Sequence, residues 1–164
     1  MSPLLFLYMQ TLNEQIAEWA FPKLEELGCF LVDVISKPSA NKIEVYIDHN
    51  DGLKIEMCEK VSRHLEFYLD TAEGVPASYN LEVSSPGMDN PFKVEQQYLK
   101  SIGKNVEVLF QDGVKKEGLL KDYNSKEITL EVFLPVKKKG QAPKSVTEVI
   151  DLNTIKYTKK KISF

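Results

Sequence analysis

The chain has 164 residues, of which 43% are hydrophobic and 27% are charged, and its net charge is −3. This composition is typical of folded globular proteins and excludes an intrinsically disordered chain. The sequence holds no run of about 20 apolar residues, which excludes a helix that spans a membrane. The short apolar start, residues 3–9, lacks the basic flank and cleavage site of a secretory signal. We therefore expect a soluble, cytosolic protein with one ordinary domain or two small ones.

The charge is divided unevenly along the chain. Residues 1–91 carry a net charge of −9, whereas residues 92–164 carry +6, from 15 lysines against 9 acidic residues. A basic half suits phosphate backbones, because binding releases condensed counterions. An acidic half is repelled by RNA but could bind a basic protein. The alternative is that both halves simply present a solvated surface.

The first helix is expected near the N-terminus. Thr11 and Glu14 form a capping box, apolar residues follow at helical spacing, and Gly28 is a natural end. Trp19 lies on the apolar stripe, which favours a place in the core over a binding site. Pro22 lies inside the run and removes a backbone donor, so we expect a kink or a break there.

Two strands, a helix and a third strand are expected next. The strands cover 29–35, 43–48 and 79–83, the first two paired as a hairpin, and the helix covers 55–70. The order α-β-β-α-β predicts a helix pair packed on a small sheet. We place the end of this acidic domain, residues 1–91, near Pro91, where the charge changes sign.

The second half consists of short strands at close, regular spacing, with a short helical turn before the last. This pattern predicts a small β-barrel over residues 92–164, whose closure would remove exposed strand edges. The fold class is therefore α+β. The expected strands cover residues 106–110, 117–123, 128–134, 145–150 and 156–159.

No catalytic set is recognisable in the sequence. It contains neither a phosphate-cradling glycine loop nor a Gly-x-Ser-x-Gly elbow. His49 and His64 have no metal-ligand partner at a useful spacing, and both are expected at the surface. Cys29 and Cys58 match no metal-ligand spacing and are expected to be small buried thiols in a reducing compartment. We therefore predict a protein that is not an enzyme and needs no cofactor and no metal.

Lysines on the predicted barrel are the candidate RNA-binding residues. Side chains on loops and strand ends can reach phosphates as point charges. This half contains no arginine, a residue that recognises base edges through paired hydrogen bonds, so sequence-specific recognition of RNA is disfavoured. Binding to the phosphate backbone or to the shape of the RNA is favoured instead. The alternative for each cluster is a solubilising loop or a frayed tail. The candidates are Lys115, Lys116, Lys137, Lys138, Lys139, Lys144, Lys159, Lys160 and Lys161.

The segment Leu-Glu-Val-Ser-Ser-Pro-Gly-Met-Asp at residues 81–89 resembles a strand and turn of the ribosome maturation factor RimP family. Residues 31–34, 51–53 and 102–106 also resemble stretches of that family, and the likeness covers about residues 11–157. The family's usual arginine before the proline is Asn90 here. The resemblance implies an α/β domain joined to an SH3-like or Sm-like barrel. It also implies a non-catalytic, monomeric assembly factor that binds ribosomal RNA and protein of the immature small subunit.

The motif also has a plain structural interpretation. Proline fixes one backbone angle, glycine permits a turn that other residues cannot make, and aspartate can hold local backbone donors. We therefore expect a turn between the two domains and give this structural role more weight than direct RNA contact. The residues concerned are Ser84, Ser85, Pro86, Gly87, Asp89 and Pro91.

Two other functions stay open from the sequence. A Sm-like regulator would act on small RNAs and form rings, although a preceding acidic domain opposes ring closure. An enzyme of unknown class could use the acidic face, and a metal or cofactor bound after purification would support it.

Overall fold

The structure, a computed structural model, describes residues 11–72, 75, 78–87, 89–135, 139–140 and 142–161. The chain divides into two compact units, Met1–Pro86 and Gly87–Phe164. The sequence placed the boundary near Pro91, which lies in the second of these units. Each unit has its own hydrophobic core and is described by itself.

The first helix, α2 (Leu12–Leu27), begins and ends as the sequence predicts. The Thr11 hydroxyl accepts a hydrogen bond from the Glu14 amide at 3.2 Å, and Gly28 adopts the left-handed conformation at φ 72°. The expected break at Pro22 was wrong, because the helix continues through this residue. The missing amide costs one hydrogen bond, whereas Ala20 and Leu24 on either side of it are buried in the core and hold the helix in place.

The first unit is a three-stranded sheet covered by two helices. Strand β1 (Cys29–Lys37) and strand β2 (Lys42–His49) form the predicted antiparallel hairpin through the short helix η1 (Pro38–Ala40). Helix α3 (Ile55–Thr71) then leads to β3 (Asn80–Ser84), which pairs in parallel with β2.

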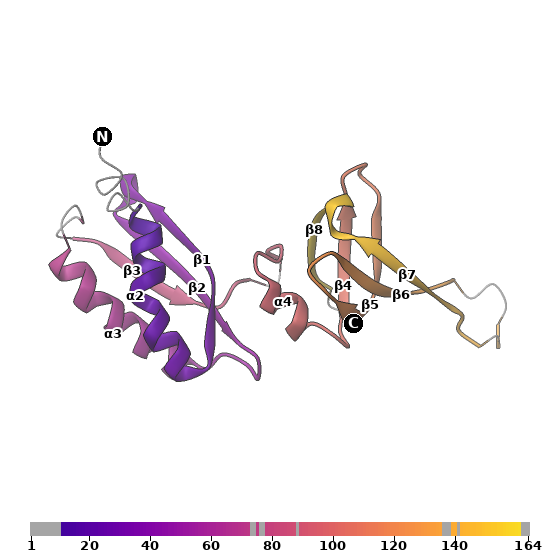
Figure 1. Ribbon diagram of the computed structural model, residues 1–164, viewed down its shortest axis with the longest axis horizontal. Coiled ribbons are helices and arrows are strands. Elements are labelled where there is room, and N and C mark those ends of the chain that lie inside the picture. Colours follow the sequence, from indigo (N-terminus) through magenta and orange to yellow (C-terminus); the bar gives the residue numbers. More distant parts are fainter. Residues whose placement is uncertain are drawn as a thin grey trace. The chain divides into compact units, whose positions relative to one another are not determined.

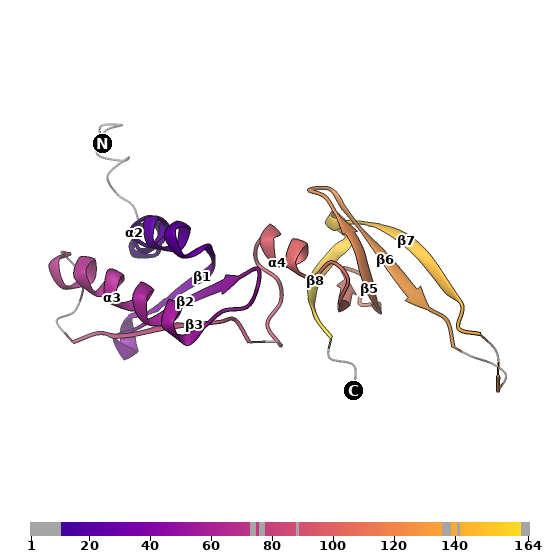
Figure 2. The ribbon, with the colours of Figure 1, turned by 90° about the horizontal axis from the view of Figure 1, so that it is seen from below.

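The strand order is β1-β2-β3, so β3 lies at an edge of the sheet. Figure 1 shows α2 and α3 side by side against this sheet, and Figure 2 shows the same unit after a turn of 90°. Alternate residues of β2 face the two helices, and their side chains build one core. The buried residues are Ile43, Val45 and Ile47 from β2, Ile16, Ala20 and Leu24 from α2, and Val61, Leu65 and Leu69 from α3.

The second unit contains helix α4 (Glu95–Lys100) and five antiparallel strands in the order β7-β6-β5-β4-β8. The strands follow the predicted pattern closely, and helix η2 (Leu152–Thr154) is the predicted short turn. No pairing between β7 and β8 is found among the described residues, so this is a five-stranded antiparallel sheet rather than a demonstrated closed barrel. The strands are β4 (Asn105–Phe110), β5 (Lys115–Tyr123), β6 (Glu127–Phe133), β7 (Ser145–Asp151) and β8 (Ile155–Lys160).

Figure 2 shows curved strands in this sheet, and two close contacts accompany this curvature. A Cβ atom on Gly118 in β5 would lie 2.5 Å from the carbonyl oxygen of Glu131 in β6, so only glycine fits there. Lys116 on β5 also reaches Glu148 on β7 at 2.6 Å, although β6 lies between these strands in the sheet. The curved face encloses the second core, formed by Val106, Val108, Leu120, Ile128, Leu130 and Ile150.

The segment before β4 is fixed to this core by aromatic residues. The Phe92 amide donates to the Thr158 carbonyl at 2.7 Å, and the Tyr98 hydroxyl donates to the Thr158 hydroxyl oxygen at 2.9 Å. The Tyr98 ring stacks on Tyr123 with centroids 4.8 Å apart and meets Phe92 edge-on at 5.0 Å. Helix α4 is therefore part of the second unit's packing.

Candidate functional site

The motif residues form the end of β3 and the turn that follows it. Ser84 is the last residue of β3 and pairs with Tyr46 of β2. Ser85 is exposed and Pro86, which is half-buried, closes the first unit. The Gly87 carbonyl accepts a hydrogen bond from the Asn90 amide at 3.0 Å, which closes a tight turn. A turn at this position is what the residue types predict.

The roles expected for two motif residues were wrong. Gly87 does not adopt a positive φ, so the turn does not need its backbone freedom. A Cβ at Gly87 would lie 3.3 Å from Asn90 Nδ2, which is a contact with the end of a side chain that can shift. The Asp89 carboxylate is exposed and accepts no hydrogen bond from any described residue. Pro91 is half-buried ahead of the Phe92 anchor.

Three of the candidate lysines pair with glutamates across the second sheet. We call Lys116, Lys159 and Lys161 the cross-strand lysines. Their charges are partly offset before a phosphate could approach, although such exposed pairs each contribute little to stability. The nitrogen-to-oxygen distances are 2.6 Å for Lys116–Glu148, 3.6 Å for Lys159–Glu107 and 3.0 Å for Lys161–Glu117.

The lysines near the C-terminus are not the frayed tail that the sequence allowed. Lys159 and Lys160 lie within β8, where they pair with Glu107 and Val106 of β4. The Lys161 amide still donates to the Asn105 carbonyl at 3.1 Å. Lys160 also has an interaction partner of its own. This cluster is therefore part of the sheet.

A second group of lysines lies at the ends of hairpins. Lys115 begins β5 directly after the β4–β5 turn, whereas Lys139 and Lys144 lie in the connection between β6 and β7. All three are exposed, and none pairs with a carboxylate of the described chain. In antiparallel order, these two connections fall at the same end of the sheet. We call Lys115, Lys139 and Lys144 the hairpin-end lysines; Lys137 and Lys138 lie outside the described residues.

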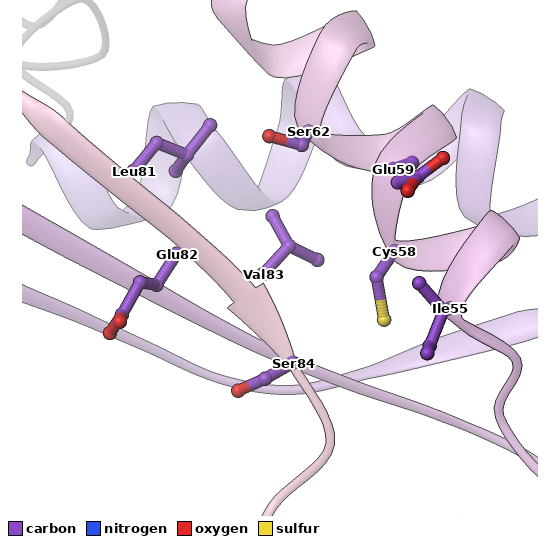
Figure 3. Close-up of a pocket in the computed structure, with 8 residues that line it drawn as sticks. All are labelled: Ile55, Cys58, Glu59, Ser62, Leu81, Glu82, Val83 and Ser84. Carbon is purple, nitrogen blue, oxygen red and sulfur yellow. The ribbon is translucent and has the colours of Figure 1, made fainter.

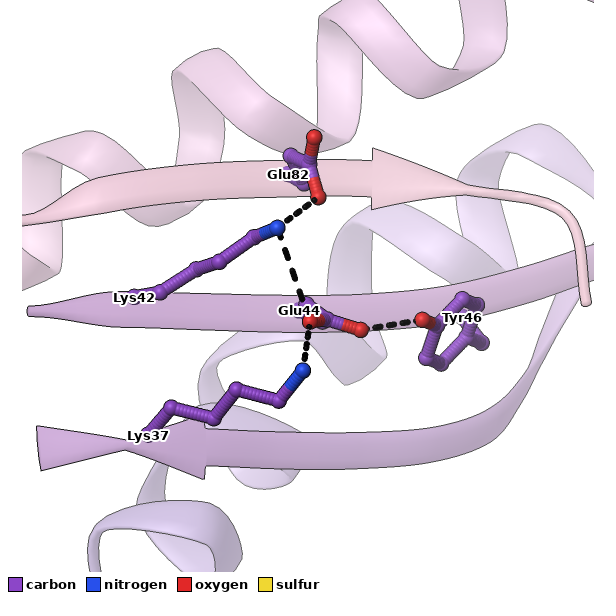
Figure 4. Close-up of polar contacts among 5 residues, drawn as sticks. All are labelled: Lys37, Lys42, Glu44, Tyr46 and Glu82. Carbon is purple, nitrogen blue, oxygen red and sulfur yellow. Dashed lines mark hydrogen bonds and ion pairs between the residues drawn. The ribbon is translucent and has the colours of Figure 1, made fainter. Parts of the chain in front are cut away.

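The sheet of the first unit carries a charged network that the sequence did not reveal (Figure 4). Glu44 on β2 pairs with Lys37 of β1 at 2.7 Å and with Lys42 at 3.7 Å, and it accepts a hydrogen bond from the Tyr46 hydroxyl. Lys42 also reaches Glu82 on β3 at 3.1 Å. These bonds, first from Lys37 and then from Tyr46, lower the pKa of Glu44 to about 2. The network ties the three strands together on the face opposite the helices.

A groove runs between α3 and β3 (Figure 3). Its volume is about 430 Å³, and Leu81 and Val83 point from β3 toward the helix while Glu82 points away. No local sequence pattern indicates this groove, because its two walls are joined only by tertiary packing. The lining residues are Ile55, Cys58, Glu59, Ser62, Leu81, Glu82, Val83 and Ser84.

The histidines have hydrogen-bond partners, and the cysteines are free thiols. His49 Nδ1 accepts a hydrogen bond from the Asp51 amide at 3.0 Å, and His64 Nε2 donates to the Trp19 carbonyl at 2.7 Å. Cys29 is buried and Cys58 is half-buried; both are free thiols, and burial raises the pKa of each. Within the described ranges, no group of three or more metal-ligating side chains is found, and no helix is long and apolar enough to cross a membrane.

A comparison with protein-family models identifies the first unit. Residues 20–89 match the model described as the RimP N-terminal domain. The match begins inside α2 and ends with the turn after β3, so it covers the sheet, α3 and the Ser-Pro-Gly motif. The match, which covers residues 20–89, supports assignment of the chain to the ribosome maturation factor RimP family.

Proposed function

We propose that this protein is a non-catalytic factor that binds the immature small ribosomal subunit and promotes its maturation. The match of residues 20–89 to the RimP N-terminal domain carries this proposal. Membership of a ribosome maturation family supports a role in ribosome biogenesis, and we assign that role to the small subunit and to the cytoplasm. We expect the protein to act as a monomer without a cofactor.

We assign RNA binding to the second unit. Its strand order, β7-β6-β5-β4-β8, is compatible with an SH3-like or Sm-like barrel, and the fold class that we propose is such a barrel. Residues 92–164 carry a net charge of +6, which favours phosphate. Among the candidate lysines, the hairpin-end group is best suited to contact RNA, because those ammonium groups have no carboxylate partner in the described chain. Lys137 and Lys138 of the same connection are proposed to join them.

We assign protein binding to the first unit. Residues 1–91 carry a net charge of −9, so a phosphate backbone is repelled. Ribosomal proteins that bind RNA are basic, and such a protein matches this surface in charge. The turn from Ser84 to Pro91 is proposed to link the two binding activities rather than to contact RNA.

The alternative is a Sm-like regulator that forms rings and acts on small RNAs. The strand order of the second unit is compatible with it, whereas the acidic first unit opposes ring closure. Sedimentation equilibrium of the purified chain separates the two, because a monomer supports the assembly factor and a ring supports the regulator.

The proposed function is tested by sedimentation of cell extracts and by deletion of the gene. The chain should sediment with free small subunits and be absent from intact ribosomes, because assembly factors leave before subunits join. The deletion strain should accumulate immature small subunits, and a copy of the gene should restore the normal profile. A normal subunit profile and normal ribosomal RNA processing in the deletion strain would contradict the proposal.

A further inference from the structure

The groove between α3 and the outer edge of β3 has the features of a peptide-binding site. We propose that it binds an extended segment of a basic protein, which adds to the sheet as a new strand alongside β3. This inference deepens the proposed function, since it rests on the assignment of protein binding to the first unit and specifies where and how the partner is held.

The outer edge of β3 offers backbone hydrogen-bonding groups. The Asn80 amide donates to the Asn41 carbonyl at 2.7 Å, so the peptide groups of Asn80 face β2. Successive residues of a strand direct these groups to opposite edges, so those of Leu81 and Val83 face outward. No described strand pairs with that edge. An unpaired edge of this kind is a template for another strand.

The groove provides room for the side chains of the added strand. Leu81 and Val83 line its floor, and α3 forms its wall with Cys58 and Ser62 (Figure 3). Ile55, at the start of α3, is 79% exposed at one end of the groove. Alternate side chains of an added strand would point toward α3 and contact this apolar surface. Small or medium apolar residues at every second position fit the volume of about 430 Å³.

The charges along the groove select a basic partner. Glu59 and Glu66 are exposed on α3 and lie seven positions apart, with Ser62 of the groove wall and the exposed cation Arg63 between them. At the far end, Asp70 accepts a hydrogen bond from the Tyr79 hydroxyl at 2.8 Å. Burial, followed by the carboxylates of Asp70 and Glu66, raises the pKa of Tyr79 to about 12, so Glu66 acts on the same end. A segment that alternates apolar and basic residues therefore matches the groove in shape and in charge, whereas RNA does not.

The direct test is nuclear magnetic resonance of the isotope-labelled full chain. The probe is a short capped peptide of alternating valine and lysine, and the control is a peptide of the same length that alternates valine and glutamate. With the lysine peptide, the amides of Leu81 and Val83 should shift and become protected from exchange with solvent. Shifts confined to other surfaces, or equal binding of the glutamate peptide, would overturn the proposal.

Backbone methylation of the probe separates strand addition from simple charge attraction. One peptide carries N-methyl groups on the backbone nitrogens of its valines, and the other carries them on those of its lysines. Each methylated peptide therefore lacks the amide donors along one edge of its strand only. Strand addition predicts that one methylated peptide binds like the parent and the other loses binding at least about tenfold, equivalent to one lost set of hydrogen bonds. Equal affinity of the two methylated peptides would contradict strand addition. This test requires no substitution in the protein.

Variants of the chain give a matched comparison. Val83→Pro removes an outward amide while leaving the groups that face β2, and it should abolish protection at this edge. Glu59→Lys should weaken the lysine peptide roughly threefold to fivefold, whereas Glu18→Lys, the same charge change at an exposed position of α2, should not. Equal effects of the two charge reversals would show that only net charge matters.

Sedimentation with small subunits distinguishes failure of this inference from failure of the proposed function. If the peptide does not bind at β3 but the chain still binds free small subunits, only the groove is wrong. If the peptide binds at β3 but the chain binds no small subunits, the groove stands and its partner is a basic protein outside the ribosome.

Discussion

The two units use their charged residues differently. In the first, the lysines Lys37 and Lys42 are engaged by Glu44 and Glu82 on the open face of the sheet, and the carboxylates of α3 are left exposed. In the second, the glutamates engage the cross-strand lysines, and the hairpin-end lysines are left exposed. In each sheet, several residues of the unit's minority charge are therefore paired, whereas residues of its majority charge remain exposed.

This difference shows why net charge alone does not locate a binding surface. The net +6 of residues 92–164 includes lysines whose nearest charged neighbour is a carboxylate of the same sheet. A phosphate near such a lysine also meets that carboxylate, which reduces the attraction. Among the candidate lysines, the hairpin-end lysines have no such partner in the described chain, so they are the positions at which substitution should matter most for RNA binding.

The largest effect on stability is expected from Gly118→Ala, which would break the second unit alone. The new Cβ would lie 2.5 Å from a backbone oxygen of β6, which cannot move without distorting the sheet. We expect a loss of about 3 kcal/mol in the unfolding free energy of this unit. Hydrogen exchange should show lost protection in β4 and β5 and unchanged protection in β2, because the two cores are separate.

Gly87→Ala is the matched control for that variant. Its Cβ would meet only the end of the Asn90 side chain, at 3.3 Å, and its backbone angle is open to alanine. The expected change is under about 0.5 kcal/mol. A loss as large as that of Gly118→Ala would mean that the motif needs glycine for a reason absent from this structure.

A pH-dependent effect on stability is expected in the first unit. The pKa of Glu44 is lowered from 4.5 to about 2, so its ion pairs stabilise the folded state above pH 4.5 and this contribution is lost as the pH falls toward 2. Glu44→Gln should remove that part of the pH dependence and lower stability near neutral pH. The measurement is thermal unfolding from pH 7 to 2, with Glu18→Gln at an exposed position of α2 as control. Parallel curves for wild type and Glu44→Gln would contradict the network's role.

The smallest effect is a gain of stability in the second unit. Ser101 is fully buried after α4, and its hydroxyl has no hydrogen-bond partner among the described residues. Ser101→Ala removes an unsatisfied polar group with little change in shape, so stability should rise by up to about 1 kcal/mol. Chemical denaturation measures this change, and a clear loss of stability would indicate that a bound water satisfies the hydroxyl.

The sequence predicted the elements well, because their signals are local. The capping box at Thr11, the end at Gly28 and the turns between the short strands depend only on neighbouring residues. The helix does not break at Pro22, because burial of the flanking turns outweighs one lost hydrogen bond.

The candidate sites were less predictable, because they depend on long-range register. The parallel pairing of β2 and β3 brings Glu82 to Lys42, and the pairing of β4 and β8 brings Lys159 to Glu107. No local pattern indicates either pairing. The α3–β3 groove has the same origin, since it forms only where a helix packs beside an edge strand.

We propose that the second unit binds small-subunit RNA through the hairpin-end lysines. The most direct measurement is titration of the chain onto free small subunits at several salt concentrations. Each lost phosphate contact lowers the salt slope by roughly 0.7–0.9, so changing Lys115, Lys139 and Lys144 to alanine should lower it by about 2–3. The same change at Lys116, Lys159 and Lys161 should lower it by clearly less. Equal decreases for both triple variants, or no decrease for either, would contradict RNA binding through the hairpin-end lysines.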